Sequence, residues 1–163
     1  MGTTFSIDDI GQDTLDSIEI QKLYDDLVSE QEDLEQAIKD AREDLKLAQA
    51  DYDPADGDES VDDALTALDD AEHDLEHFIT EHSGIMRDIE DAMEQVGEDW
   101  KYGIELINER YWEDFVQQDL EEMGYISKDA WFIEVDWKRT AENIAMDYTT
   151  VDLGDHTYYA RSC

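Results

Sequence analysis

Two histidines stand four residues apart in the segment His73-Asp74-Leu75-Glu76-His77. Histidines at positions i and i+4 share one face of a helix, and this segment matches the H-x-x-E-H pattern of some zinc peptidases. Leu75 falls on the apolar side of the segment, however, which directs both histidines toward solvent. No glycine-rich or cleft-forming sequence surrounds them. We therefore expect no catalytic centre here, and at most adventitious metal binding.

A second candidate metal site is the aspartate-rich stretch that begins at Asp51. A calcium loop of the EF-hand type needs Gly at its sixth position and Glu at its twelfth. Counted from Asp51, those positions hold Asp56 and Asp62, and Gly57 comes one residue late. We interpret the stretch as a solvated turn, with weak binding of Ca²⁺ or Mg²⁺ as the alternative.

Residues for other kinds of chemistry are missing from the sequence. The one cysteine is the last residue, Cys163, so neither a disulfide within the chain nor a CxxC metal site is possible. No nucleophile with partner residues and no phosphate-binding glycine loop can be found. The first ten residues have no basic segment of the signal-peptide type, and no run of about 18 apolar residues occurs. We expect a cytoplasmic protein that is not an enzyme and needs no cofactor or metal.

The net charge of the chain limits the classes of partner that it can bind. Its 163 residues include 47 Asp and Glu against 11 Lys and Arg, which gives a net charge of −36. Such a chain is repelled by nucleic acids and by anionic membranes. A content of 40% hydrophobic and 10% aromatic residues is too high for a disordered acidic tail. We expect a folded protein whose partner is basic.

The elements that carry this charge are predicted by two heptad series. Both alternate steps of four and three, which is typical of a coiled-coil seam. A short polar loop separates them, so we expect an antiparallel helical hairpin, with Ser60 as the second N-cap and Ser83-Gly84 as a weak point. The first series is Ile20, Tyr24, Leu27, Gln31, Leu34, Ile38, Ala41, Leu45, Ala48 and Tyr52. The second is Val61, Leu65, Leu68, Glu72, Leu75, Ile79, His82, Met86, Ile89, Met93, Val96 and Trp100.

Two consequences follow from the seam. Glu72 and His82 interrupt the second series, and we interpret them as a register device or as contacts inside the core. A two-helix hairpin buries only one face of each helix, so we expect a homodimer formed through the hairpin.

The last third of the chain has a different pattern. It predicts an amphipathic helix from 108 to 123 closed by Gly124, and a strand at 131–135. Asp136 should cap a helix from 137 to 146, and Gly154-Asp155 should turn a β-hairpin of 149–153 and 156–160. The expected fold is mostly α with a small α+β module. Its segments are an N-terminal segment at 1–18, the acidic hairpin at 19–104 and the module at 105–163.

A series of short motifs runs through this module in a fixed order: Glu113-Asp114-Phe115, Gly124, Val135-Asp136-Trp137, Ala141, Met146-Asp147-Tyr148-Thr149, Val151-Asp152, Gly154, Tyr158-Tyr159 and Arg161. In this order the module resembles the C-terminal part of the ArdA antirestriction proteins and their phage and plasmid relatives, over about a third of the chain. Lys138 and Glu142 depart from the family pattern, and a helical hairpin replaces the other domains of the family. The resemblance implies an elongated, dimeric mimic of duplex DNA that occupies the DNA groove of type I restriction–modification enzymes.

The hairpin itself has a charge density close to that of DNA. Residues 20–100 hold 28 acidic and 5 basic side chains. Over a hairpin of ~50 Å this is about one net charge per ~2.2 Å, against one per ~1.7 Å of duplex DNA. An ordinary solvated helix mixes both signs, but Arg87 is the only basic residue between Ala50 and Trp100. Halophilic adaptation and a generic acidic scaffold are the alternative causes.

We therefore expect a DNA-mimic inhibitor of a host DNA-binding defence system, either a type I restriction–modification enzyme or a CRISPR effector. The alternative is a coiled-coil adaptor, or chaperone-like protein, that binds a basic protein. A metal-dependent hydrolase is a remote third possibility. The predicted partner-binding residues are outward carboxylates: Asp63, Asp70, Asp74, Glu81, Asp88, Asp91, Glu98, Asp114, Glu121 and Glu122.

Overall fold

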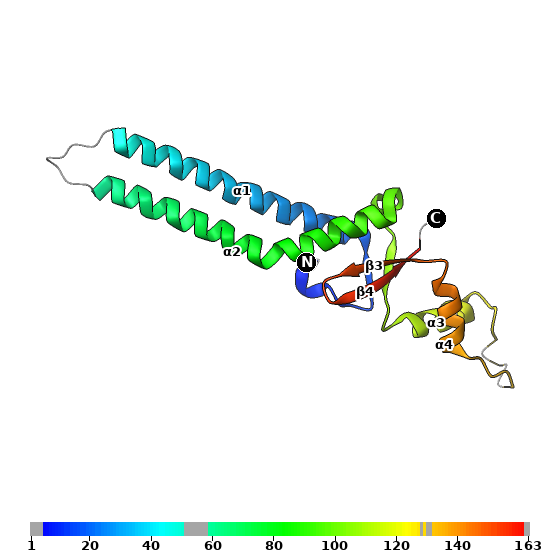
Figure 1. Cartoon of the computed structure of the whole chain (residues 1–163). Coiled ribbons are helices and arrows are strands. Elements are labelled where there is room, and N and C mark those ends of the chain that lie inside the picture. The colour runs from blue at the N-terminus through cyan, green and yellow to red at the C-terminus, as the bar shows by residue number, and fades with distance from the viewer. Residues whose placement is uncertain (1–4, 51–58, 128, 130–131, 162–163) are drawn as a thin grey trace. The chain divides into compact units, whose positions relative to one another are not determined.

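The computed structural model describes residues 5–50, 59–127, 129 and 132–161, and two long helices dominate it (Figure 1). The expected fold, mostly α with a small α+β module, is confirmed. None of the helices in these ranges is both long and apolar enough to cross a membrane. The helices are η1 (Ile7–Asp9), α1 (Ser17–Ala50), α2 (Glu59–Val96), η2 (Gly97–Tyr102), α3 (Trp112–Glu122) and α4 (Trp137–Ala145). The strands are β1 (Thr14–Asp16), β2 (Glu105–Asn108), β3 (Thr149–Leu153) and β4 (His156–Ala160).

The chain forms two compact units. One consists of Asp25–Met86, the larger part of the helical hairpin, and the other joins Met1–Tyr24 to Arg87–Cys163. The sequence-based segments at 1–18 and 105–163 both contribute to the second unit, because β1 from the N-terminal segment pairs with β2.

The seam of α1 is confirmed. Each of its predicted positions from Ile20 to Ala48 is buried or half-buried, and Tyr52 lies outside the described residues. Ile20, Leu27 and Ile38 are the most deeply buried of the set. The four–three repeat of apolar residues is therefore sufficient to orient this helix.

The seam of α2 was predicted wrongly at alternate positions. Leu65, Glu72 and Ile79 are exposed, while Phe78 is buried and Ala64 and Ala71 are half-buried. In the structure, every second seam position lies one residue earlier than predicted. The observed series is Val61, Ala64, Leu68, Ala71, Leu75, Phe78, His82, Ile85, Ile89, Ala92 and Val96. Both series alternate threes and fours. Because the two series have the same spacing, periodicity alone does not decide between them, and the wrong one was chosen.

The ends of α2 also differ from the prediction. The helix begins at Glu59, so Ser60 lies in its first turn and is not the N-cap. It ends at Val96, and the 3₁₀ helix η2 carries the chain on to Tyr102, with buried Trp100 inside it. Ser83 and Gly84 lie within the helix without interrupting it.

The four strands form one antiparallel sheet in the order β1-β2-β4-β3. The predicted hairpin of β3 and β4 is confirmed, with Leu153 opposite His156 and Gly154 in the turn at a φ of +58°. The strands β1 and β2 were not predicted. Residue 108 ends β2, so α3 starts at Trp112 and not at the predicted position.

Ser17 connects the start of α1 to the residues just before β2, in and after η2. Its side chain is fully buried, where its hydroxyl donates to the Trp100 carbonyl oxygen at 2.7 Å and accepts from the Ile104 N–H at 2.9 Å. The indole N–H of Trp100 also donates to the Gln21 side chain at 3.1 Å. The base of the hairpin is thus fixed by buried polar contacts as well as by apolar packing.

Replacing this hydroxyl should measurably destabilise the protein. Ser17→Ala removes both hydrogen bonds of the hydroxyl: the half-buried Ile104 N–H loses its acceptor, and the Trp100 carbonyl oxygen keeps only the Gly103 N–H at 3.4 Å. We expect a loss of about 1–3 kcal/mol in the free energy of unfolding. Urea denaturation followed by circular dichroism measures it. Ser29→Ala, at an exposed position of the same helix, is the control and should change stability little. Equal stability of both variants would contradict the structural role of Ser17.

An aromatic cluster centred on Trp112 holds the C-terminal helices on the sheet. The Trp112 ring lies 4.7 Å from those of Tyr148 and Tyr159, measured between centroids, and stacks on Phe115 at 5.7 Å. Its indole N–H donates to the Ala141 carbonyl oxygen at 2.9 Å. Helix α3, helix α4 and the sheet therefore meet at one side chain.

The connection between α3 and α4 partly departs from the prediction. Gly124 follows α3 at a φ of +77°, and Tyr125 N–H donates to the Leu120 carbonyl oxygen at 3.0 Å, which confirms the predicted helix stop. Asp136 caps α4 as predicted, accepting from the Arg139 N–H at 3.1 Å. Residues 132–135 are not a strand, and Trp131 lies outside the described residues.

Two half-buried tyrosines make stability sensitive to alkali. Burial raises the pKa of Tyr148 and of Tyr159 above the ordinary value of 10.0, and for Tyr148 the nearby Arg161 acts in the opposite direction. The unfolded chain then loses these protons first as the pH rises. Their contribution to stability is complete below the unfolded pKa and decreases as the pH rises through the folded pKa. We expect urea midpoints to fall above about pH 10, and to fall less when both tyrosines are replaced by Phe.

Candidate partner-binding surface

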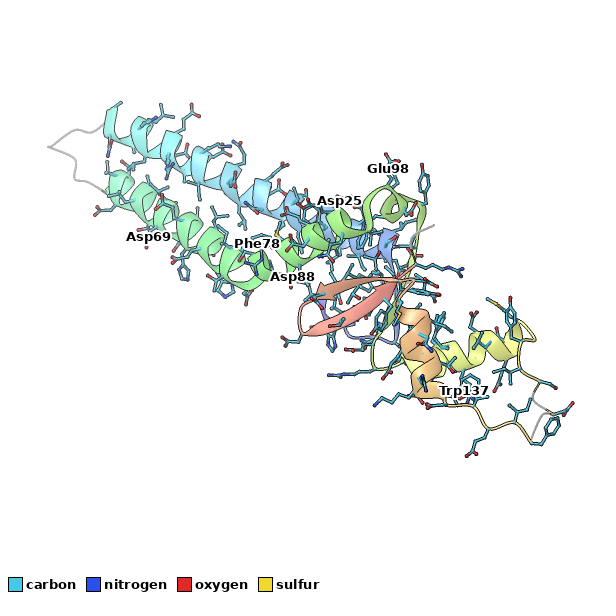
Figure 2. All side chains as sticks on the ribbon, turned by 45° about the vertical axis from the view of Figure 1, so that its right-hand side comes forward. Asp25, Asp69, Phe78, Asp88, Glu98 and Trp137 are labelled. Atoms are coloured by element: carbon cyan, nitrogen blue, oxygen red, sulfur yellow. The ribbon has the colours of Figure 1, made fainter. Side chains whose placement is uncertain are left out.

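The two long helices share the acidic charge unequally. Helix α2 carries 13 carboxylates and a single cation, Arg87, whereas α1 carries 10 carboxylates and four cations. Figure 2 shows side chains standing out along both helices, with Asp69 on α2 labelled. A helix with so few opposite charges gains little from intrahelical ion pairs and repels itself. Helix α2 is therefore the more strongly anionic element.

Four predicted residues lie on the part of α2 that belongs to the hairpin unit. Asp63, Asp70, Asp74 and Glu81 are all exposed, as predicted. Their spacings of seven, four and seven place them along one side of the helix, next to the true seam. At about 1.5 Å of rise per residue this row extends over about 27 Å. The structure thus places four exposed carboxylates in a row on one helix side.

The other predicted residues belong to the second unit, and they differ in exposure and in hydrogen bonding. Asp91, Glu98, Asp114 and Glu122 are exposed. Asp88 is only partly exposed, because its carboxylate accepts from the Gly154 N–H at 3.1 Å and so joins α2 to the β3–β4 turn. Glu121 is half-buried and accepts from the Gln117 side-chain amide at 3.1 Å. Both of these carboxylates have structural partners within the protein.

Neutralisation by the protein's own cations is small. Even if each of the 11 Lys and Arg were paired with one carboxylate, 36 carboxylates would remain. One cation does bridge the hairpin: Arg42 on α1 lies 2.8 Å from Glu72 on α2. Glu72 therefore interrupts the predicted seam because it lies at the surface, in an ion pair that links the two helices. The interpretation of Glu72 as a contact inside the core is therefore wrong, and its role as a register device stays a prediction.

His82, the second interruption, faces the seam. Its ring meets Phe78 edge to face at 4.7 Å between centroids, and its Nδ1 is buried without a hydrogen-bond partner among the described residues. A shallow groove beside it is lined by Glu30, Leu34, Asp74, His77, Phe78, Glu81 and His82. His77 Nδ1 lies 3.4 Å from the Glu81 carboxylate at the rim of this groove.

The structure describes only one of the two candidate metal sites that the sequence suggested. His73 and His77 are exposed, as the seam position of Leu75 indicated. Among the residues with described positions, no group of three or more His, Cys, Asp or Glu side chains has the arrangement of a metal site. The aspartate-rich turn at 51–58 lies outside those residues, so its capacity for cations stays a prediction.

Comparison with protein-family models, with curated proteins and with solved structures finds no match to this chain.

Proposed function

We propose that the protein is a stoichiometric inhibitor that mimics duplex DNA and occupies the DNA-binding surface of another protein. The observation that carries this proposal is the acidic side of α2, where Asp63, Asp70, Asp74 and Glu81 are exposed along a helix that contains one cation in 38 residues. A charge row of this density costs stability through self-repulsion. A cationic groove would convert that cost into attraction.

The geometry of the row supports DNA as the object of the mimicry. Asp70 and Asp74 are four residues apart, which puts their Cβ atoms about 5–6 Å from each other, a distance comparable to that between neighbouring phosphates. The two outer steps of seven residues are each about 10 Å long, so the row repeats the negative charge at wider intervals there. The helix is also a rigid rod, so the charges keep their spacing without further ordering on binding. A protein that grips the backbone of duplex DNA would meet a similar arrangement of negative charge here.

The class of target that we propose is a host defence complex that binds DNA, either a type I restriction–modification enzyme or a CRISPR effector. The resemblance of the C-terminal module to the ArdA proteins favours the first. The functional groups are carboxylates that bind and do not react, so the proposal includes no catalysis and no cofactor.

Competition with DNA tests the proposal directly. A purified type I restriction–modification complex and a purified CRISPR effector, each holding a labelled duplex, are titrated with the protein. We expect the duplex to be released from one of them at about one protein per DNA-binding site. Raising the salt concentration should weaken the interaction, because screening shortens the range of the carboxylate field. A complex that holds duplex and protein together, each with undiminished affinity, would contradict the mimicry.

A further inference from the structure

Three of the four histidines of the chain lie close together on α2. They are His73, His77 and His82, and the fourth, His156, lies in β4. This stretch of α2 surrounds Phe78, which is labelled in Figure 2. Histidine is the side chain whose charge ordinarily changes between about pH 5 and about pH 8. The charge of this part of the helix therefore depends on pH.

His77 lies within the row of exposed carboxylates that carries the proposed function. It follows Asp74 by three residues and precedes Glu81 by four, so both are its neighbours on the helix surface. Its side chain is 64% exposed, and its Nδ1 lies 3.4 Å from the Glu81 carboxylate. A positive charge on this ring is therefore a charge in the contact surface itself.

The groove beside His77 holds no permanent positive charge. The helix α1 contributes Glu30 to its lining, and α2 contributes Asp74, Glu81 and His82 as the other charged or titratable groups. Among the described residues, no Lys or Arg lies within 4.0 Å of these three carboxylates. Protonation of His77 places a cation where the permanent charges are all negative.

The other two histidines of α2 have different surroundings. His82 faces the seam, where its Nδ1 is buried, so its charge belongs to the packing of the two helices and not to the contact surface. His73 is exposed one helical turn before His77 and three residues after Asp70, at the edge of the row. His77 is thus the histidine that lies between two members of the row.

We propose that His77 belongs to the partner-binding surface and makes the affinity of that surface dependent on pH. This inference rests on the proposed function, because it concerns the same side of α2. In mildly acidic solution the protonated ring adds a positive charge between Asp74 and Glu81, and it forms an ion pair with Glu81. A cationic partner then meets one repulsion more and one attraction fewer. The protein binds such a partner more weakly in mildly acidic solution than in neutral solution.

Two substitutions hold residue 77 in one charge state. His77→Gln is neutral at every pH, and His77→Lys stays positive. The competition assay with labelled duplex is run at about pH 8 and about pH 6, which span the ordinary titration of histidine. On acidification we expect wild-type protein to lose about two- to tenfold in affinity relative to His77→Gln. His77→Lys should show that loss already at the higher pH. Because all variants meet the same target, the response of the target to pH cancels in the comparison.

Ile79→Lys is the matched control for the added charge. Ile79 is exposed two residues after His77, about 200° around the helix from it, so its substitution adds the same charge away from the row. This variant should weaken binding less than His77→Lys and should keep the response of wild-type protein to pH. Circular dichroism shows whether the variants remain folded.

A short arginine-only peptide provides a probe that does not depend on the proposed target. Its side chains keep their charge over this pH range. Calorimetry with the full chain should show weaker binding to His77→Lys than to Ile79→Lys. The inference would be overturned if wild-type protein and His77→Gln responded equally to pH, or if His77→Lys and Ile79→Lys bound the target and the peptide equally well. Absence of DNA displacement with the peptide response intact would overturn the proposed function alone, and displacement that is insensitive to the charge at residue 77 would overturn this inference alone.

Discussion

Reversing the charge of Asp63, Asp70, Asp74 and Glu81 together to Lys should lower the affinity for the proposed DNA-binding target by roughly 10- to 1,000-fold. Each exposed carboxylate contributes little alone, so Asp70→Lys by itself should change affinity only a few-fold. The four act on the same field, and each reversal replaces an attraction by a repulsion. The competition assay with labelled duplex measures the loss.

Two further variants identify the contact surface. Reversing Asp114, Glu121 and Glu122 to Lys tests the C-terminal module in the same assay, although Glu121 is half-buried and also loses its contact with Gln117. A coiled-coil adaptor would respond differently, since Leu34→Asp in the seam should abolish its binding while surface charge matters little. Unchanged affinity after the fourfold reversal on α2 would exclude that side of the helix as the contact surface.

Trp112→Ala should be among the most destabilising single substitutions in the C-terminal module. The side chain is 5% exposed and contacts three aromatic rings, so its removal leaves a large cavity at the junction of two helices and the sheet. We expect a loss of about 3–5 kcal/mol in the free energy of unfolding. Urea denaturation, followed by tyrosine fluorescence and by circular dichroism, measures it.

Two substitutions separate the parts of this effect. Trp112→Phe retains a ring but removes the indole N–H that donates to the Ala141 carbonyl oxygen, and should cost about 0.5–1.5 kcal/mol. Trp137→Ala changes the same residue type at a half-buried position and should cost less than Trp112→Ala. If the two alanine variants were equally stable, the aromatic cluster would not be the centre of the module.

The sequence predicted elements whose signals are local. Both long helices follow from four–three periodicity, and the turn at Gly154, the stop at Gly124 and the cap at Asp136 each depend on a residue with a specific backbone role. The strands β1 and β2 were missed because they have three and four residues, too few for an alternating pattern to show. The strand expected at 131–135 reflected aromatic and β-branched side chains. Such propensity does not reveal whether a sheet edge lies within reach.

The same limit applies to the candidate surface. Exposure of Asp63, Asp70 and Asp74 could be predicted because it depends only on distance from the seam. The role of Asp88 could not, since its partner Gly154 lies 66 residues away in the sequence. The place of Phe78 in the seam was missed because neighbouring Ile79 is equally apolar, and only packing against α1 decides between the two.

The pairing of β1 with β2 has a consequence for how the molecule can change. Asp16 at the end of β1 lies opposite Glu105 at the start of β2, so the whole helical hairpin is an insertion between two adjacent antiparallel strands. Adding or deleting one heptad in each helix preserves the seam and leaves both strand ends where they are. Each such step alters the hairpin by about 10 Å. The length of the hairpin is therefore adjustable, and evolution or design can change it in steps of one heptad while the sheet stays the same.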